Sequence, residues 1–203
     1  MTYVKICGVK TVQDAQLCVA AGADALGLNF YPGSSRYIDV ASAQAIASAV
    51  AGQIALIGVF VNEKESTVAT IRDALNLTFV QFHGDETPEL VQRFLPSAYR
   101  AFRVRGSDSL DEARHFPGDH LLVDAYVPGM PGGTGSSFDW NLATPIARER
   151  KVFIAGGLTP DNVAAAICTT NPYAVDVASG VESSPGVKNP LLVARFVARA
   201  KQR

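Results

Sequence analysis

The chain has little of several features that mark particular classes of protein. Its three cysteines, Cys7, Cys18 and Cys168, are an odd number, lie far apart and show no CxxC spacing. This pattern argues against a disulfide framework and against a zinc module. No basic segment followed by a long apolar stretch opens the chain, and no apolar run approaches the ~20 residues that a membrane span needs. We therefore expect a soluble protein of the reducing cytoplasm, with no membrane partner.

An excess of charge of one sign is also missing. The 203 residues carry 18 Lys and Arg against 19 Asp and Glu, which gives a formal net charge of -1. Proteins that bind nucleic acid through a charged surface are usually basic, so we expect no nucleic-acid partner. An anionic ligand would have to be held by local groups.

Short apolar segments alternate with amphipathic segments along the whole chain, and no linker or low-complexity tract divides it. We expect strands at 3–7, 25–30, 55–61, 79–83, 99–104, 121–124, 152–155 and 174–178. We expect helices at 11–21, 41–50, 65–75, 88–95, 140–147, 160–167 and 190–203. The remaining helix, within 108–115, is expected to be short or irregular. Eight such units predict an α/β fold, a (βα)8 TIM barrel that forms a single domain over residues 1–203. A doubly wound open sheet usually has fewer strands.

In such a barrel the chemistry lies at the carboxyl ends of the strands. Lys5 and Cys7 share one face of the first strand because side chains alternate, and we expect both to point inward. Cys7 is either a buried structural cysteine or a thiol that transfers protons, and a neighbouring cation would favour the thiolate. Cys18 lies on a predicted helix and Cys168 directly follows the end of one, and we expect both to be buried structural cysteines.

Other polar residues follow the ends of later strands. Asp124 is a candidate general acid, with an N-cap or turn aspartate as the alternative. Asp176 is expected to bind substrate hydroxyls or to orient loops. Arg36 has a planar guanidinium suited to a carboxylate, although surface arginines are common. Gln81 and His83 are possible supporting residues, and His83 has no partner at the spacing of a metal site.

Two glycine-containing strand ends favour a phosphate site. IAGGLTP contributes Gly156 and Gly157, and VASGVE contributes Ser179 and Gly180. Barrel enzymes often bind phosphate at the last two such loops, where glycine lets the backbone approach the anion. The glycine-rich loop 127–139 lacks the spacing of a nucleotide P-loop, so we do not expect an ATPase. That loop is either a mobile flap over the mouth or a flexible connection.

Taken together, the motifs resemble the phosphoribosylanthranilate isomerase family of tryptophan biosynthesis. KICG, SSRYI, QFHGDE, GGTGSSFDW, AGGL and SGVESSPGVK occur in the family's order across nearly the whole chain. The chain departs from the family pattern at Ala178, where a serine is expected, and at Asn189, where an aspartate is usual.

The resemblance implies a (βα)8 barrel and an intramolecular oxidoreductase, an aldose–ketose isomerase. Its reaction would be the Amadori rearrangement of N-(5-phosphoribosyl)anthranilate to 1-(2-carboxyphenylamino)-1-deoxyribulose 5-phosphate. By the same resemblance Cys7 is the general base and Asp124 the general acid, and Arg36 holds the anthranilate carboxylate. The backbone around Gly156, Gly157, Ser179 and Gly180 would hold the phosphate. It implies a phosphorylated small-molecule substrate and no cofactor or metal, and we expect a monomer or a homodimer.

Three alternatives remain. A pentose-phosphate epimerase on a similar barrel would share the phosphate loops but needs metal ligands at the strand ends, which a single His83 does not supply. Another phosphate-binding barrel of amino-acid synthesis should not need both Cys7 and Asp124. A non-catalytic binding module would leave that acid and base unexplained.

Overall fold

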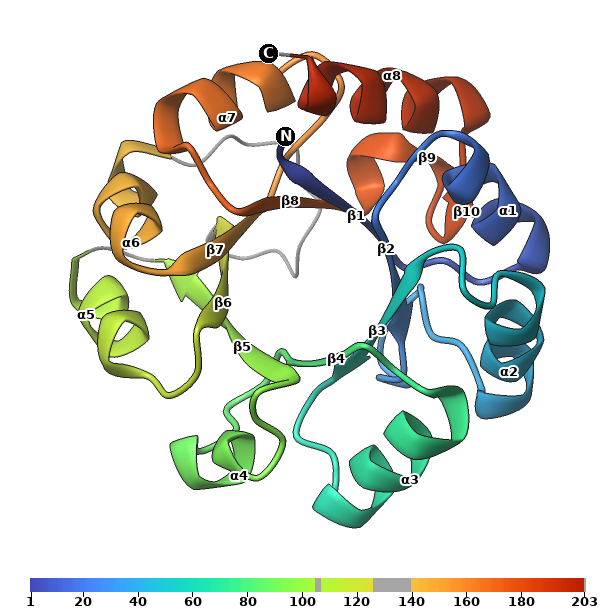
Figure 1. Cartoon of the computed structure of the whole chain (residues 1–203), viewed down its shortest axis with the longest axis horizontal. Helices are drawn as coiled ribbons and strands as arrows, with labels where there is room; N and C mark the ends of the chain where they lie inside the picture. The colour runs from blue at the N-terminus through green and yellow to red at the C-terminus, as the bar shows by residue number, and fades with distance from the viewer. Residues whose placement is uncertain (105–106, 126–139, 203) are drawn as a thin grey trace.

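A closed barrel of eight parallel strands forms the centre of the computed structural model, which describes residues 1–104, 107–125 and 140–202 (Figure 1). β1 pairs with β2 on one side and with β8 on the other, which closes the ring. The strands are β1 (Tyr3–Cys7), β2 (Ala25–Asn29), β3 (Ala55–Phe60), β4 (Phe79–Phe82), β5 (Ala98–Val104), β6 (His120–Ala125), β7 (Lys151–Ala155) and β8 (Ala174–Val177). Each begins and ends within one residue of its predicted position, so the predicted (βα)8 barrel is confirmed.

The helices surround the barrel on the outside (Figure 1). They are α1 (Val12–Ala20), α2 (Val40–Ala49), α3 (Glu65–Leu75), α4 (Pro88–Gln92), α5 (Ser107–His115), α6 (Thr144–Glu149), α7 (Val163–Thr170) and α8 (Pro190–Lys201), with the 3-10 turn η1 (Trp140–Ala143) before α6. Side-chain caps fix several starts: Thr11, Asp39, Thr87 and Asn189 each accept a hydrogen bond from a backbone N–H of the first turn. Asn189 thus does what an aspartate would do at that position. No helix in the described ranges is long and apolar enough to cross a membrane.

The helices between β4 and β6 differ in length from expectation. α4 stops at Gln92 rather than Leu95, because Pro96 disfavours helical backbone at the residue before it. α5 spans nine residues and is longer than the five-residue α4. Its single leucine gives it little apolar periodicity, which is why the sequence predicts a short helix. Arg114 in its last turn stabilises it, because a positive charge suits the negative end of the helix dipole. Glu112 also ties it to Arg100 of β5, with 2.8 Å between Oε1 and Nη1.

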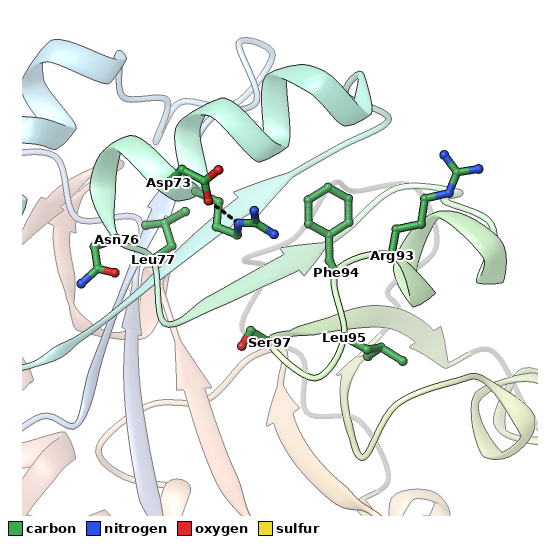
Figure 2. Close-up of a pocket in the computed structure, with 8 residues that line it drawn as sticks. Asp73, Asn76, Leu77, Arg93, Phe94, Leu95 and Ser97 are labelled. Carbon is green, nitrogen blue, oxygen red and sulfur yellow. Dashed lines mark hydrogen bonds and ion pairs between the residues drawn. The ribbon is translucent and has the colours of Figure 1, made fainter.

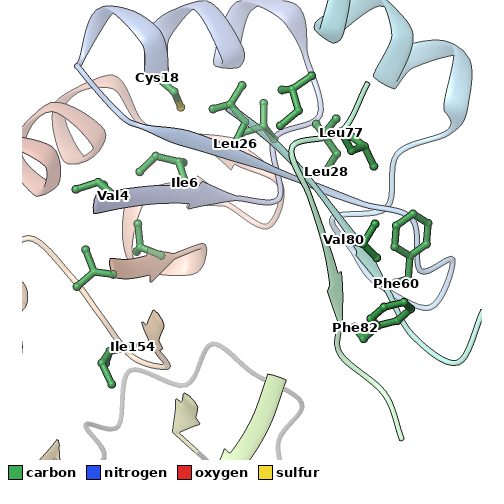
Figure 3. Close-up of a cluster of buried hydrophobic side chains, with 14 of the residues drawn as sticks. Val4, Ile6, Cys18, Leu26, Leu28, Phe60, Leu77, Val80, Phe82 and Ile154 are labelled. Carbon is green, nitrogen blue, oxygen red and sulfur yellow. The ribbon is translucent and has the colours of Figure 1, made fainter. Parts of the chain in front are cut away.

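Two buried clusters lie on the two faces of the barrel wall. The outer cluster contains Val4 and Ile6, which point from β1 toward Cys18 of α1 (Figure 3). The inner cluster fills the barrel with Ala25, Ile57, Tyr99, Ala101, Leu122, Phe153, Ala155 and Ala174. Residues two positions from this inner set therefore also face the interior, among them Asp124 and Asp176. Alternation on the strands thus selects which polar side chains reach the barrel mouth.

The two helical cysteines lie in different surroundings. Cys18 is fully buried, as predicted. Cys168 is exposed, so the prediction that it is buried was wrong. Val163, Ala166 and Thr170 form the buried face of α7, and Cys168 falls on its opposite side.

A short hairpin between β8 and α8 was not predicted. The 3-10 turn η2 (Ser179–Val181) leads into β9 (Glu182–Ser184), which pairs antiparallel with β10 (Val187–Lys188). Gly186 in the connecting turn has a φ of +82°, which favours glycine. Strands this short show no alternation that a sequence pattern can reveal.

Candidate active site

A buried ammonium group lies inside the barrel, near the carboxyl ends of the strands. Lys5 on β1 is fully buried, and its Nζ donates to Asp176 Oδ2 at 2.8 Å and to Gln81 Oε1 at 2.7 Å. Burial opposes the charge, but the nearby Asp176 carboxylate and Cys7 thiol outweigh it and raise the pKa of Lys5 well above its ordinary value. Lys5 is therefore a fixed cation, and three residues predicted separately lie together around it.

Cys7 follows Lys5 on the same inward face and is only partly exposed. Gly27 of β2 leaves room for both side chains: a Cβ on Gly27 would lie 2.6 Å from Cys7 Sγ and 3.1 Å from Lys5 Cε. Burial raises the pKa of the Cys7 thiol, the Lys5 ammonium lowers it, and the net direction is upward. The prediction that Lys5 favours the thiolate is right in sign, but burial outweighs that effect.

Asp124 at the end of β6 lies beside His83, which follows β4. The distance between His83 Nε2 and Asp124 Oδ2 is 3.5 Å, and both side chains are partly exposed. The other ring nitrogen, Nδ1, lies 2.8 Å from Nε2 of Gln81. Because Gln81 also contacts Lys5, one chain of polar contacts joins the side of the mouth that carries Cys7 to the side that carries Asp124.

Arg36 lies at the mouth but is already paired. Its Nε and Nη2 donate to the two carboxylate oxygens of Glu182 at 2.8 and 2.6 Å. Its aliphatic part rests on Gly8, where a Cβ would lie 2.5 Å from Arg36 Cδ. Gly8 has a φ of +74°, so both its conformation and this contact require glycine after Cys7. The Glu182 contact raises the pKa of Arg36, and its Nη1 group is not used in that pair.

Two charged residues of the hairpin that contact this site, Glu182 and Lys188, were not predicted from the sequence. Lys188 is buried and donates to Glu182 Oε1 at 2.7 Å and to the carbonyl oxygen of Cys7 at 2.6 Å. Burial opposes the charge on Glu182, but Arg36 and Lys188 together lower the pKa of its carboxyl group. Both residues lie in the SGVESSPGVK motif, where they form a pair of opposite charges on the two sides of a Pro-Gly turn. That pattern is also common on surfaces.

The two glycine loops pack directly against each other. A Cβ on Gly180 would lie 1.8 Å from the carbonyl oxygen of Leu158, so only glycine fits there. Gly156 and Gly157 have φ values of +86° and +63°. Asn162 braces the turn: it donates to the carbonyl of Gly157 at 2.9 Å and accepts from the backbone N–H of Thr159 at 2.8 Å. Ser179 begins η2 next to this contact.

The remaining candidates lie outside this site. The loop 127–139, predicted as a flap or a connection, lies outside the described residues. A groove between α3 and α4 is lined by Asp73, Leu77 and Phe94 (Figure 2). Its lining residues come just before β4 and β5 in the chain, so the groove lies at the amino ends of the strands, opposite the mouth. Within the described part of the chain, no group of three or more His, Cys, Asp or Glu side chains is placed to hold a metal ion.

Comparison with known proteins gives one consistent result. The family model for N-(5'phosphoribosyl)anthranilate (PRA) isomerase matches residues 4–199. A protein of Citrifermentans bemidjiense named N-(5'-phosphoribosyl)anthranilate isomerase is 44% identical over 202 residues, which cover 100% of this chain and 98% of that protein.

Solved structures agree in fold and in sequence. The phosphoribosyl anthranilate isomerase of Thermotoga maritima superposes with a TM-score of 0.91 at 37% identity, and 99% of each chain is covered. A crystal structure of such an isomerase in complex with reduced 1-(o-carboxyphenylamino)-1-deoxyribulose 5-phosphate has a TM-score of 0.88 at 35% identity, again with 99% of each chain covered.

Proposed function

This chain belongs to the N-(5'-phosphoribosyl)anthranilate isomerase family, and we propose that it performs that isomerisation with Cys7 as the general base and Asp124 as the general acid. The activity is the conversion of N-(5-phosphoribosyl)anthranilate to 1-(2-carboxyphenylamino)-1-deoxyribulose 5-phosphate in tryptophan biosynthesis. The overall change moves hydrogen within one molecule, so the protein must deliver and remove protons at defined atoms.

Two proton transfers by side chains and a final tautomerisation carry the reaction. Asp124 gives its proton to the ribose ring oxygen, the bond from C1 to that oxygen breaks, and the open chain is left as a Schiff base. The thiolate form of Cys7 then removes the proton from C2 to give an enolamine and the Cys7 thiol. A proton added at C1 and lost from the C2 hydroxyl turns the enolamine into the ketone, and no covalent bond to Cys7 is formed.

The positions of Cys7 and Asp124 in the barrel support their assignment as base and acid. Cys7 is the last residue of β1 and Asp124 the last but one of β6, both on the inward face, at the barrel end where parallel strands present catalytic groups. A thiol and a carboxyl group on different sides of the mouth can act on different atoms of one sugar. The chain of Lys5, Gln81 and His83 between them is supported by distances of 2.7 to 3.5 Å.

We assign the non-reacting parts of the substrate to Arg36, to Asp176 and to the glycine loops. Glu182 holds the Arg36 guanidinium by two N–H groups, which leaves Nη1 for the anthranilate carboxylate. Asp176 is 6% exposed, and its Oδ1 has no hydrogen-bond partner in the described parts of the chain, so it suits a sugar hydroxyl. The backbone at 156–157 and 179–180 would hold the phosphate, which is supported by the packing of Gly180 on Leu158.

The test is the loss of substrate fluorescence on adding purified enzyme. Cys7→Ala and Asp124→Asn should each lower kcat by about a hundredfold to ten-thousandfold, the usual range for a positioned acid or base. Arg36→Ala should mainly raise KM, because it removes a contact to the ring that does not react.

Matched variants control for the substitutions themselves. Cys168→Ala and Asp119→Asn change the same residue types at exposed positions and should keep wild-type turnover. Retained turnover in Cys7→Ala or Asp124→Asn would refute that residue's role, and an unchanged KM in Arg36→Ala would refute the carboxylate contact.

We also propose that residues 1–203 form one domain that works in the cytoplasm as a monomer or a homodimer. The barrel strands and α8 extend from Tyr3 to Lys201, which supports a single domain. One Thermotoga maritima structure is of monomers made from a dimeric relative, so dimers occur in the family. A single unfolding transition would test the single domain, and the mass measured by light scattering would test the oligomeric state. Two separate transitions would contradict the first, and a mass above that of a dimer would contradict the second.

A further inference from the structure

A chain of polar contacts crosses the barrel mouth and includes the ring of His83. Its members come from three strands: Lys5 from β1, Gln81 and the adjoining His83 from β4, and Asp124 from β6. The links are 2.7 Å from Lys5 to Gln81, 2.8 Å from Gln81 to His83 and 3.5 Å from His83 to Asp124. Each link limits which atom of the next residue can donate.

The Gln81 amide can have only one orientation. An ammonium group has only donors, so Lys5 must face the amide oxygen. The hydroxyl of Tyr99 donates to the same oxygen at 3.0 Å. Gln81 is 1% exposed, so no solvent competes for this oxygen. The amide NH2 group is therefore the end that faces His83.

It follows that Nδ1 of His83 accepts a hydrogen bond. In a neutral imidazole, one nitrogen accepts and the other carries the proton. With Nδ1 as acceptor, the proton is on Nε2, the atom that faces Oδ2 of Asp124. The 3.5 Å separation is longer than an ordinary hydrogen bond, and contacts of catalytic groups often shorten when substrate binds.

The backbone around His83 is held in place independently. The N–H of His83 donates to the carbonyl of Phe60 on β3 at 2.8 Å. The next residue, Gly84, donates to the carboxylate of Glu86, which is buried and also accepts from the N–H of Asn62 at 2.7 Å. The ring is thus attached to a rigid segment and directed at Asp124.

We propose that Gln81 selects the Nε2–H tautomer of His83 and that this tautomer makes His83 a positioning residue for Asp124. Its N–H directs the carboxyl group of Asp124 and stabilises the carboxylate that remains after the proton has gone to the substrate. This proposal deepens the proposed function, since it rests on Asp124 as the general acid. The tautomer itself can be measured without any activity.

Nitrogen NMR of protein labelled with ¹⁵N-histidine tests the tautomer directly. The chain has only three histidines, so single substitutions at His83, His115 and His120 assign the signals. In the wild type, His83 should show a protonated Nε2 and an unprotonated Nδ1. A protonated Nδ1 with an unprotonated Nε2 would overturn the proposal.

Gln81→Glu should change this state. One oxygen of the new carboxylate would accept from Lys5, and the other would face Nδ1 and require a donor there. The Nδ1 signal should therefore move to that of a protonated nitrogen. An unchanged His83 spectrum would show that Gln81 does not select the tautomer. If this variant does not fold, the wild-type spectrum still decides the tautomer. Gln81→Met then tests the selection, because it removes the amide and should leave the tautomer of His83 no longer fixed.

Kinetics test the consequence for catalysis. Gln81→Glu should lower kcat by about tenfold to a hundredfold, less than the loss of Asp124 itself, with little change in KM. Gln53→Glu makes the same charge change at an exposed position and should leave both constants unchanged. A change in KM alone would overturn the positioning role. Retained turnover in Asp124→Asn would instead refute the proposed acid and leave the tautomer result standing.

Discussion

At the scale of single residues, two neighbours act on the acidity of Cys7 in opposite directions. After burial, the Lys5 ammonium lowers the pKa of the thiol and the Asp176 carboxylate raises it. Lys5→Met should therefore raise the pKa of Cys7 further, and Asp176→Asn should lower it. The rate of alkylation by iodoacetamide across a pH series measures both, because only the thiolate reacts. The midpoint should move to higher pH in the first variant and to lower pH in the second.

The other cysteines set the background for that experiment. Cys168 is exposed and would react, so all variants should carry Cys168→Ser. Burial raises the pKa of Cys18 to about 12, which keeps it silent. Removing one partner of a buried ion pair costs about 3–5 kcal/mol, so circular dichroism must show that each variant is folded. If the pH midpoint of Cys7 alkylation moves in the same direction in both variants, Lys5 and Asp176 do not act on the pKa of Cys7 in opposite directions.

Residues of the site differ in how far the sequence could predict them. Lys5, Cys7, Asp124 and Asp176 follow from strand alternation, because an inward phase and a strand end fix where a side chain points. The pairing of Arg36 with Glu182 joins residues 146 positions apart, and no local pattern encodes it. Sequence reasoning therefore assigned Arg36 a ligand but did not find the residue that holds its guanidinium.

At the scale of elements, the β9–β10 hairpin joins Cys7, the proposed base, to Arg36, the proposed carboxylate ligand. Lys188 of β10 donates to the carbonyl of Cys7 at 2.6 Å and to Glu182, which in turn holds Arg36. Lys188→Met should leave the Cys7 carbonyl without this donor and Glu182 with one cation fewer. We expect a loss of about 3 kcal/mol in the free energy of unfolding, because a buried charge loses a partner. Urea unfolding measures it.

The same variant should affect both kinetic constants. Displacement of Cys7 lowers kcat, and displacement of Arg36 raises KM. Lys64→Met removes the same charge from an exposed position and should change neither stability nor kinetics. Wild-type stability together with wild-type kinetics in Lys188→Met would mean that the hairpin does not organise the site.

Element boundaries were predictable where local chemistry sets them. The strands matched because buried parallel strands are continuous apolar runs with polar ends. Helix starts at Thr11 and Thr87 follow from capping side chains. α7 begins at Val163 rather than Pro160, because Asn162 uses its side chain to close a turn with Thr159. The hairpin was missed because strands of three and two residues leave no period to detect.

At the scale of the whole molecule, the barrel has two chemically different ends. The mouth holds the buried ion pair of Lys5 and Asp176, whereas aromatic rings fill the opposite end. There Tyr3 stacks on Tyr173 with 5.8 Å between ring centroids, and His120 lies 5.0 Å from Phe79. The count of eight units predicted the closed barrel. The ring contacts could not be predicted, because they join distant strands that only the closure of the barrel brings together. This division places stability at one end and chemistry at the other.

His120 should make the stability of the whole barrel depend on pH. Burial, with Lys151 as a smaller cause, lowers the pKa of its ring below the ordinary 6.5. Between these two values the unfolded chain binds more protons than the folded one, so the free energy of unfolding rises with pH. This contribution is complete above about pH 6.5 and is lost as the pH falls through the folded pKa.

Urea unfolding at about pH 7.5 and about pH 5.5 measures that difference. The free energy of unfolding should fall less on acidification in His120→Gln than in the wild type, because the variant has no ring to protonate among the aromatic side chains. His115 is exposed, so the free energy of unfolding of His115→Gln should fall on acidification by as much as that of the wild type. Since His120 begins β6 and Asp124 lies near its other end, kcat and KM at about pH 7.5 should stay at wild-type values in both variants. An equal loss of stability on acidification in His120→Gln and wild type would show that the aromatic end of the barrel is not the source of the pH dependence.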